Sequence, residues 1–493
     1  MRIGGLISLR TVALAGLAAL ATGLFVACTT ALPGDASATI ARANEAMGGA
    51  KLKSIRYTAE GTGYTYGQAF VPTSAWPKIT VHSQVRQINY DTASMREEIT
   101  LSRAEPTGGG GYPLQGQQRN DQFVSGGFAW NAGPSGPVPG PRFVADRVHQ
   151  LWITPHGALR AAQRNKANAQ PRGDGSTALM FSEPGRFIAT VFVGTDGLVQ
   201  RVDSRVPDPV LGEVDVVTRY SNYRDVGGGV RFPGRIEQSM AGAAVLDVQV
   251  GSVEPNAAVD ISVPEAVRSA GERVTTDKLA DGVWFVGGGS HNSVAIEMKD
   301  HLVLVEAPLN DGRSVPVIDA VKALAPGKPI RYVINSHQHF DHAGGLRTAV
   351  AEGATIVTQA ANVPYLERVL GTPNRIAPDR LAASGRTAAF MAVADKATLS
   401  DGARTIDIHR ITGSVHSDSF LMVHLPAEKI LIEADAYTPL PPGAAPPSTP
   451  NANNVNLIDN IERLRLGVER IAPLHGRVVP LADLYAAAGR QPR

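Results

Sequence analysis

The sequence contains a single cysteine, Cys28, among its 493 residues. A structural disulfide within the chain is therefore excluded, and stability has to come from hydrophobic cores. An excess of charge of one sign is also lacking, because 47 basic residues face 45 acidic ones for a formal net charge of +2. Nucleic-acid binding requires a concentrated basic surface, so we expect no nucleic-acid partner.

Long apolar runs are scarce, apart from one near the N-terminus. Residues 11–27 (TVALAGLAALATGLFVA) follow a stretch with two arginines and no acid, and end at Cys28. The run is shorter than the about 20 apolar residues of a membrane span and predicts a signal-peptide core. Its end, Leu24–Cys28, resembles the bacterial lipoprotein signal, which implies a lipid anchor on Cys28. Ordinary cleavage after Ala38 is the alternative, and either one predicts export to the cell envelope or periplasm.

The sequence also lacks an internal repeat of about 20–50 residues, which excludes solenoid architectures. Its Gly-rich stretch at 108–111 has neither the GxGxxG nor the GxxxxGK spacing of a phosphate-binding loop. The 51 glycines and 34 prolines instead favour turn-rich β structure. A chain of this length is expected to form two or three domains.

The N-terminal half begins with a short amphipathic helix and continues as strands. Residues 39–47 place Ile40, Ala43 and Met47 on one helical face, before two glycines that end the helix. Apolar residues then alternate, as in VLDVQV at 245–250. We expect a mostly antiparallel β domain, a curved sheet or open barrel with one helix. Its strands are expected to include 54–64, 78–90, 95–103, 187–193, 198–206, 214–223, 230–240 and 245–250.

Two segments of this half, 41–53 and 220–235 (YSNYRDVGGGVRFPGR), resemble the outer-membrane lipoprotein-sorting and carrier family. The resemblance implies a concave apolar sheet face that holds an acyl chain; the alternative is that this face is a filled core. The predicted organisation is a signal segment at 1–28, a linker at 29–38, the β-rich domain at 39–264, a second linker at 265–273 and an α/β domain at 274–493.

The main chemical motif follows a predicted buried strand at 330–335. Residues 336–345 read SHQHFDHAGG, which includes His337, His339, Asp341 and His342. In an extended loop, residues two apart point the same way, so His337 and His339 can bind one metal ion together. Asp341 and His342 follow after a turn and can reach a second ion. Imidazole and carboxylate groups at this density favour zinc, with manganese or iron as alternatives.

The HxHxDH pattern resembles that of the metallo-β-lactamase superfamily, whose fold is an αββα sandwich. The resemblance covers 274–493 and requires three further ligands, which are His416 in GSVHSDSF, Asp435 in ILIEAD and His475 in APLHG. It implies two zinc ions. The implied ligands are His337, His339 and His416 for the first ion and Asp341, His342 and His475 for the second, with Asp435 bridging the two.

The resemblance implies a hydrolase in which a hydroxide shared by the metals attacks a carbonyl carbon and one metal polarises its oxygen. Asp435 at the bridging position resembles glyoxalase II, lactonases and related esterases. The expected substrate is therefore a small lactone, ester, thioester or similar molecule of the envelope. A β-lactamase, which Asp435 disfavours, is one alternative, and an acyl- or lipid-binding envelope protein with a structural metal domain is another. The oligomeric state is left open.

Several other residues receive predicted roles. Asp341 is expected to orient the nucleophile as well as to bind metal, and Tyr437 to donate a hydrogen bond to the oxyanion. The proline-rich segment 437–454 is interpreted either as one wall of the substrate pocket or as a passive connector, and 457–471 as a core helix. The remaining histidines are predicted to be structural: His82, His149, His156, His291, His301, His409 and His424.

Overall fold

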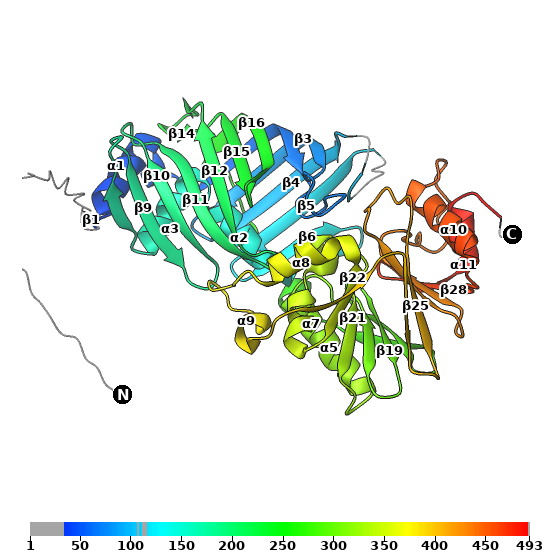
Figure 1. Ribbon diagram of the computed structural model, residues 1–493. Coiled ribbons are helices and arrows are strands. Elements are labelled where there is room, and N and C mark those ends of the chain that lie inside the picture. Colours follow the sequence, from blue (N-terminus) through cyan, green and yellow to red (C-terminus); the bar gives the residue numbers. More distant parts are fainter. Residues whose placement is uncertain (1–33, 106–107, 111–115, 492–493) are drawn as a thin grey trace, which may run out of the picture.

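The structure is a computed structural model that describes residues 34–105, 108–110 and 116–491. A domain built on one large sheet lies beside a domain built on two smaller sheets (Figure 1). The predicted signal segment and Cys28 lie outside the described residues. Among the helices of the described part, none is long and apolar enough to cross a membrane.

The N-terminal domain contains a 14-stranded sheet in which each neighbouring pair of strands is antiparallel, as the alternating sequence pattern predicts. The strands are β1 (Gly34–Asp35), β2 (Ser54–Tyr64), β3 (Lys78–Asn89), β4 (Ser94–Arg103), β5 (Gln118–Ser125), β6 (Phe128–Gly133), β7 (Gly136–Pro139), β8 (Asn168–Pro171), β9 (Thr177–Glu183), β10 (Phe187–Val193), β11 (Val199–Asp208), β12 (Gly212–Ser221), β15 (Arg235–Met240) and β16 (Ala243–Pro255). Strand β2 pairs with β16 on one side and with β3 on the other, and its last pair joins Tyr64 to Lys78.

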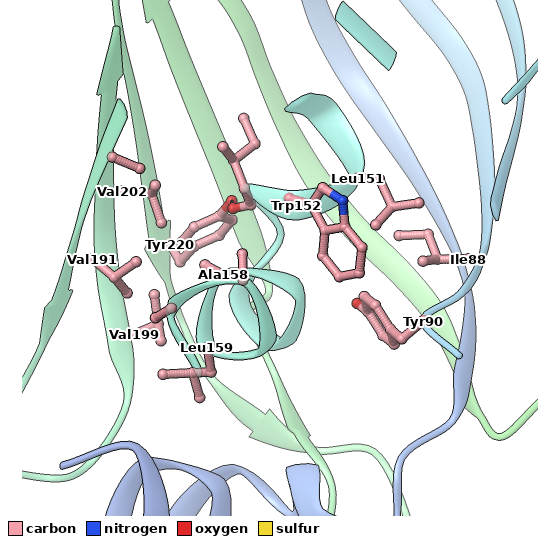
Figure 2. Packing of buried hydrophobic residues seen from close by; sticks show 14 of the residues in the cluster. Ile88, Tyr90, Leu151, Trp152, Ala158, Leu159, Val191, Val199, Val202 and Tyr220 are labelled. Atoms are coloured by element: carbon pink, nitrogen blue, oxygen red, sulfur yellow. Dashed lines mark hydrogen bonds between the residues drawn. The ribbon is translucent and has the colours of Figure 1, made fainter. Parts of the chain in front are cut away.

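Three helices pack against this sheet: α1 (Ser37–Met47), α2 (Val144–Trp152) and α3 (Pro155–Arg164). The prediction of a single helix in this domain was therefore wrong. The apolar residues Val148, Leu151 and Trp152 lie at helical spacing in α2, and Pro155 occupies the first turn of α3, where its missing N–H is tolerated. Figure 2 shows Leu151 and Trp152 of α2 and Ala158 and Leu159 of α3 among buried strand residues.

Apolar side chains of the helices and of the sheet share one core, and an open groove of about 810 Å³ lies between α1, α3 and β8 at the edge of the domain. A small cavity remains beside Arg86, whose guanidinium forms a buried ion pair with Glu97, and its volume is about 20 Å³. This volume holds about one water molecule. At this place in the described part of the domain there is no room for an acyl chain, which favours the filled-core interpretation of the concave face.

A short α4 (Glu265–Arg268) and a two-stranded ribbon of β13 (Arg224–Asp225) and β14 (Arg231–Phe232) complete the described helices and strands of this half. Three-residue 3₁₀ turns lie at 49–51, 141–143 and 360–362. The strand predicted at 230–240 is divided between β14 and β15, because Pro233 has no N–H for a sheet and Gly234 turns the chain.

The C-terminal domain is the predicted αββα sandwich. Its first sheet contains β17 (Thr275–Ala280), β18 (Val283–Gly287), β19 (Ser293–Glu297), β20 (Leu302–Val305), β21 (Ile330–Ile334), β22 (Thr355–Gln359) and β23 (Ala389–Val393). Its second sheet contains β24 (Lys396–Ser400), β25 (Thr405–Arg410), β26 (Leu421–Leu425), β27 (Ile430–Glu433), β28 (Arg470–Pro473) and β29 (Val479–Pro480). A hydrophobic core joins residues of both sheets.

Helices lie on the outer sides of the two sheets. They are α5 (Asp311–Leu324), α6 (Phe340–Ala343), α7 (Leu346–Glu352), α8 (Val363–Leu370) and α9 (Arg380–Ser384) with the first sheet, and α10 (Ala452–Leu464) and α11 (Leu481–Ala487) with the second. The core helix predicted at 457–471 begins earlier and ends sooner. It stops at Leu464 because Arg465 adopts a left-handed φ of 52°, and Ile471 lies in β28.

Candidate metal centre

The HxHxDH motif lies where β21 ends and the short helix α6 begins. Asn335, the first residue after the strand, donates a hydrogen bond from its side chain to the carbonyl oxygen of His337 at 2.7 Å. Asn335 is fully buried and also accepts a hydrogen bond from Thr358. The turn that carries the histidines is therefore fixed from within the sandwich.

Three histidine rings form the first group of candidate ligands. The Nε2 atom of His337 lies 2.9 Å from Nδ1 of His339 and 3.1 Å from Nε2 of His416. The prediction that residues two apart in this loop point the same way is confirmed for His337 and His339. His416 reaches them from the loop between β25 and β26.

Asp435, which follows β27, lies between two groups of histidines. Its Oδ2 atom is 3.2 Å from Nε2 of both His337 and His416. The same oxygen lies 2.8 Å from Nε2 of His342, and Oδ1 lies 3.0 Å from Nε2 of His475. One carboxylate therefore contacts members of both groups, which is the arrangement that a bridging ligand requires.

The second group contains His342, His475, Asp341 and also His291, which the sequence did not predict to be a ligand. The Nε2 atoms of His342 and His475 are 3.1 Å apart. His291, predicted to be structural, lies with its Nε2 atom 3.0 Å from Oδ2 of Asp341, and its ligand atom falls within 4.8 Å of those of the other three residues. His291 therefore belongs to the candidate metal centre, which corrects the sequence-based interpretation.

Polar groups behind the rings fix their orientation. The hydroxyl of Ser336 lies 2.9 Å from Nδ1 of His337. Oε2 of Glu306, a fully buried residue at the end of β20, lies 3.3 Å from Nδ1 of His342, while Oε1 accepts a hydrogen bond from the backbone N–H of Ser336. Groups of this kind set the tautomer and the direction of metal-binding histidines. Glu306 lies outside the HxHxDH motif, so the motif alone gives no indication of its role.

Burial and neighbouring charges set the protonation of the candidate ligands. Burial lowers the pKa of His337 to about 3 and that of His339 well below its usual value, so both rings are neutral. Burial opposes ionisation of Asp435 and Asp341, but His342 beside both carboxylates outweighs it and holds each pKa well below the ordinary range. The same carboxylates raise the pKa of His342 well above its usual value and also raise that of His475, so these two rings favour the protonated form. A metal ion bound there would replace their protons, because the neutral imidazole is the form that binds metal.

The residues fit a metal centre on chemical grounds. Ring nitrogens of His337, His339 and His416 converge with a carboxylate oxygen of Asp435, and these four ligand atoms lie within 4.8 Å of one another. Asp341 brings a second carboxylate to the other group. Several nitrogen and oxygen donors that face a common point suit zinc or a similar transition metal.

Exposure differs across the site. The side chains of His337, His339 and His342 are buried, whereas those of Asp341, Asp435 and His475 are 29%, 19% and 18% exposed. A substrate can therefore approach from the side of these three residues.

Tyr437 follows Asp435 by two residues in the sequence, but its side chain is 2% exposed and packs in the core of the sandwich. Burial, together with the nearby charge of Asp483, raises its pKa to about 12, so the phenol is neutral. Its predicted role as an oxyanion donor stays a prediction that this packing does not support.

The proline-rich segment after Tyr437 touches the site only at its beginning. Pro439 packs against Gly476, the neighbour of His475, and the carbonyl oxygen of Leu440 accepts a hydrogen bond from Arg477 at 2.6 Å. Residues 441–446 are exposed. The segment therefore supports the His475 turn, and its role as a pocket wall stays a prediction.

The N-terminal domain also reaches the cluster. Gln68 donates a hydrogen bond from Nε2 to Oδ1 of Asp341 at 2.8 Å, and Nε2 of His339 lies 3.0 Å from the carbonyl oxygen of Ala69. Neither Gln68 nor Ala69 was predicted to be near the site, because nothing in the local sequence of either one indicates a contact with the metal motif.

Comparison with known proteins gives one family match. Residues 286–475 match the sequence profile of the metallo-beta-lactamase superfamily, a range that includes all eight side chains of the two groups. No curated protein matches the chain.

Solved structures with some likeness are metallo-β-lactamases. The enzyme from Pontibacter korlensis is 17% identical, with 44% of this chain and 98% of that chain covered and a TM-score of 0.34. One from Pseudomonas aeruginosa in a mono-zinc form is 19% identical, with 44% and 93% covered and a TM-score of 0.33. One from Hirschia baltica is 21% identical, with 45% and 99% covered and a TM-score of 0.32.

The assignment to a family therefore rests on the sequence profile and on the sandwich fold rather than on these distant structures. The profile, the αββα architecture and the convergence of histidines and aspartates at the strand ends agree with one another. The C-terminal region of this chain, residues 286–475, belongs to the metallo-β-lactamase superfamily.

Proposed function

We propose that this protein is a di-zinc hydrolase of a small lactone, ester, thioester or similar substrate. Family membership and the His/Asp site support a metal-dependent hydrolase. The observation that carries the proposal is the position of Asp435, whose two oxygens contact histidines of both groups. The three histidines His337, His339 and His416 would hold one ion, and Asp341, His342 and His475 the other, with Asp435 shared and His291 beside them.

Two bound zinc ions would supply a nucleophile at neutral pH and would polarise the carbonyl oxygen of the substrate. The residues of the chain supply the rest. His337 and His339 are buried and held by neighbours, so they form the fixed floor of the site. Asp341 lies on the more exposed side, where its carboxylate is placed to orient a water molecule toward the substrate.

Metal analysis combined with a hydrolysis screen tests this proposal. The purified protein is expected to contain about two metal ions per chain and to hydrolyse at least one class among lactones, aryl esters, thioesters, phosphodiesters and β-lactams. Turnover confined to β-lactams would replace the proposed substrate class. His339→Ala should abolish both the activity and at least one equivalent of bound metal.

A matched control is His82→Ala, because His82 is an exposed histidine of the N-terminal sheet whose ring contacts Ser102. This variant should keep its metal and its activity. If His339→Ala hydrolyses the substrate as fast as the parent protein, the chemistry belongs to another site.

We also propose that the protein is exported and tethered to the membrane through a lipid on Cys28. The sequence of residues 11–28 supports this. The alternative, cleavage after Ala38, would cut inside helix α1, and it would remove Ala36, which is 3% exposed in the core. Mass spectrometry of the N-terminal peptide from the membrane fraction tests the tether, and Cys28→Ala should release the protein into the soluble fraction.

A further inference from the structure

The loop between β2 and β3, residues 65–77, connects the N-terminal sheet to the metal motif. We call it the β2–β3 loop. It is longer than the about 2–5 residues of an ordinary hairpin connection, and long loops of this kind often carry function. Three successive contacts join it to the motif: the backbone N–H of Phe340 donates to Gly67, Nε2 of His339 lies 3.0 Å from the carbonyl oxygen of Ala69, and Gln68 donates to Asp341.

The contact at Ala69 determines the protonation of His339. A carbonyl oxygen only accepts hydrogen bonds, so Nε2 of His339 must carry the proton at this 3.0 Å distance. In the imidazole tautomer with its proton on Nε2, Nδ1 keeps its lone pair. Nδ1 is the atom that faces Nε2 of His337 in the first group. A backbone carbonyl of the N-terminal domain thus prepares a candidate ligand of the C-terminal domain.

The contact at Gln68 acts on the second group. Its carboxamide donates to Oδ1 of Asp341 at 2.8 Å and leaves Oδ2 facing His291 and His342. Gln68 is itself held by backbone hydrogen bonds, because its N–H donates to Thr65 and its carbonyl accepts from Gly110. The direction of the Asp341 carboxylate therefore depends on a side chain that belongs to the other domain.

The fit between the loop and the motif is close. Gly67 has a φ of +76°, and a Cβ atom at this position would lie 2.4 Å from Cγ of Phe340. The rings of Tyr66 and Phe340 meet edge to face at 5.1 Å. The side chain of Gln338 also donates to the carbonyl oxygen of Ala69, at 2.7 Å. The residues between the candidate ligands of the motif thus form the surface on which the loop rests.

The same loop supports the loop that carries His416. The backbone N–H of Asp418 donates to the carbonyl oxygen of Phe70 at 3.1 Å. Ser417 and Ser419 donate to Oε1 of Gln338, whose amide group contacts the loop. The two segments that hold five of the candidate ligands, the HxHxDH motif and the His416 loop, are therefore linked through one element of the N-terminal domain.

We infer that the β2–β3 loop is a structural part of the metal centre, with Gln68 and the Ala69 carbonyl as positioning groups for Asp341 and His339. This inference rests on the proposed function, since it assumes that these side chains hold metal. The loop closes the His337–His339 side, where both rings are fully buried, and leaves the side of Asp435 and His475 accessible. The N-terminal domain thus takes part in forming the site.

The first test is Gln68→Ala in the full-length protein, with metal affinity measured by competition with a chromophoric zinc chelator. Removal of a group that orients a metal ligand typically lowers metal affinity about 10–100-fold, so we expect the weaker zinc ion to bind at least about tenfold less tightly. The cobalt-substituted protein should show an altered visible absorption spectrum, since a ligand carboxylate changes direction. Gln170→Ala is the matched control, because Gln170 is an exposed glutamine on β8 of the same domain.

A second pair of variants tests the backbone contact. Gly67→Ala places a methyl group against Phe340 and should displace the Ala69 carbonyl, with a loss of affinity at the first ion as well. Gly185→Ala is its control: Gly185 has a similar φ of +70° but no atom within 4 Å of the added Cβ. Both variants carry the same backbone strain, so only a contact effect distinguishes them.

The outcomes separate this inference from the proposed function. If the parent protein binds no zinc and hydrolyses nothing, the proposed function fails. If the parent binds zinc and turns over substrate, while Gln68→Ala and Gly67→Ala match their controls in zinc affinity and cobalt spectrum, the β2–β3 loop has no part in the metal centre and the inference is wrong.

Discussion

Both domains bury histidines, but they surround them differently. In the N-terminal domain, His149 and His156 lie apart, and each has one ring nitrogen with a partner: the Ser204 hydroxyl at 2.8 Å and the Met47 carbonyl at 3.1 Å. Each ring also packs against a phenylalanine. In the C-terminal domain, six histidines and two aspartates converge so that their ligand atoms form two groups.

The difference shows what distinguishes a structural histidine from a candidate ligand. Burial alone does not, because His149 and His337 are both almost inaccessible to solvent. Convergence does: within the described part of the chain an isolated ring belongs to no group of candidate ligands, whereas ring nitrogens and carboxylate oxygens that lie within 4.8 Å of one another form a set of donors that a cation can bind. His291 follows this rule although its sequence context gave no indication of it.

The largest expected difference is between removing a histidine of the metal centre and removing an isolated histidine of the N-terminal domain. His291→Ala should lower zinc affinity at the second group by about 10–100-fold, as loss of a group beside a metal ligand does, with little change in stability of the N-terminal domain. His156→Ala should leave zinc affinity unchanged and destabilise the fold by about 2 kcal/mol, because it leaves a buried carbonyl without its donor. Chelator competition and urea denaturation measure the two effects. Equal zinc affinity in both variants would contradict the distinction.

Acid should act on the N-terminal domain through its isolated histidines. Burial lowers the pKa of His149 to about 3 and that of His156 to about 4. In the unfolded chain both histidines have a pKa of about 6.5, so below that pH the unfolded state binds more protons than the folded state. The stability that the neutral rings contribute is present above pH 6.5 and is lost as the pH falls toward the folded values, by about 1.4 kcal/mol per pH unit for each ring.

Urea denaturation at pH 7 and pH 5, in the presence of a chelator so that metal loss plays no part, measures this effect. His156→Phe should reduce the difference between the two pH values, because one of the two titrating rings is gone and Phe can keep the stacking on Phe232. Equal stability of the parent protein at both pH values would show that these rings are not buried as described.

The smallest expected effect belongs to Tyr437. Because its side chain packs in the core of the sandwich, Tyr437→Phe should change the catalytic rate by less than about twofold and zinc affinity not at all. A loss of rate of a hundredfold, the size expected of an oxyanion donor, would restore the role that its sequence position suggested.

The sequence predicted the candidate site well where ligands follow strands. His337, His339, Asp341 and His342 share one turn, and Asp435 follows a short apolar strand, so local patterns located them. His291 follows β18 in a segment without a motif, and only the pairing of β18 with β19 shows that this strand ends beside the others. Ala69 contacts His339 through its backbone carbonyl oxygen, which every residue has, so the sequence could not indicate this contact.

The fold was predicted to a similar extent. Alternating residues located strands such as β2 and β10, whose bounds agree with the prediction. Helices α2 and α3 were missed because they lie within a domain dominated by period-two patterns, where short helical stretches are hard to distinguish from strands. The end of α10 was misplaced because a left-handed residue, Arg465, stops the helix without a glycine.

The pairing of β2 with β3 has a consequence for how the protein is made. Ala69 and His339 are separated by 270 residues. During synthesis the β2–β3 loop therefore leaves the ribosome long before the HxHxDH motif that it contacts. The register that joins Tyr64 to Lys78 fixes where this loop begins and ends. A slip of one residue would move the strand by about 3.4 Å and turn its side chains to the opposite face. A register error between β2 and β3 would therefore misplace the loop and impair the metal centre, even if the C-terminal domain folds.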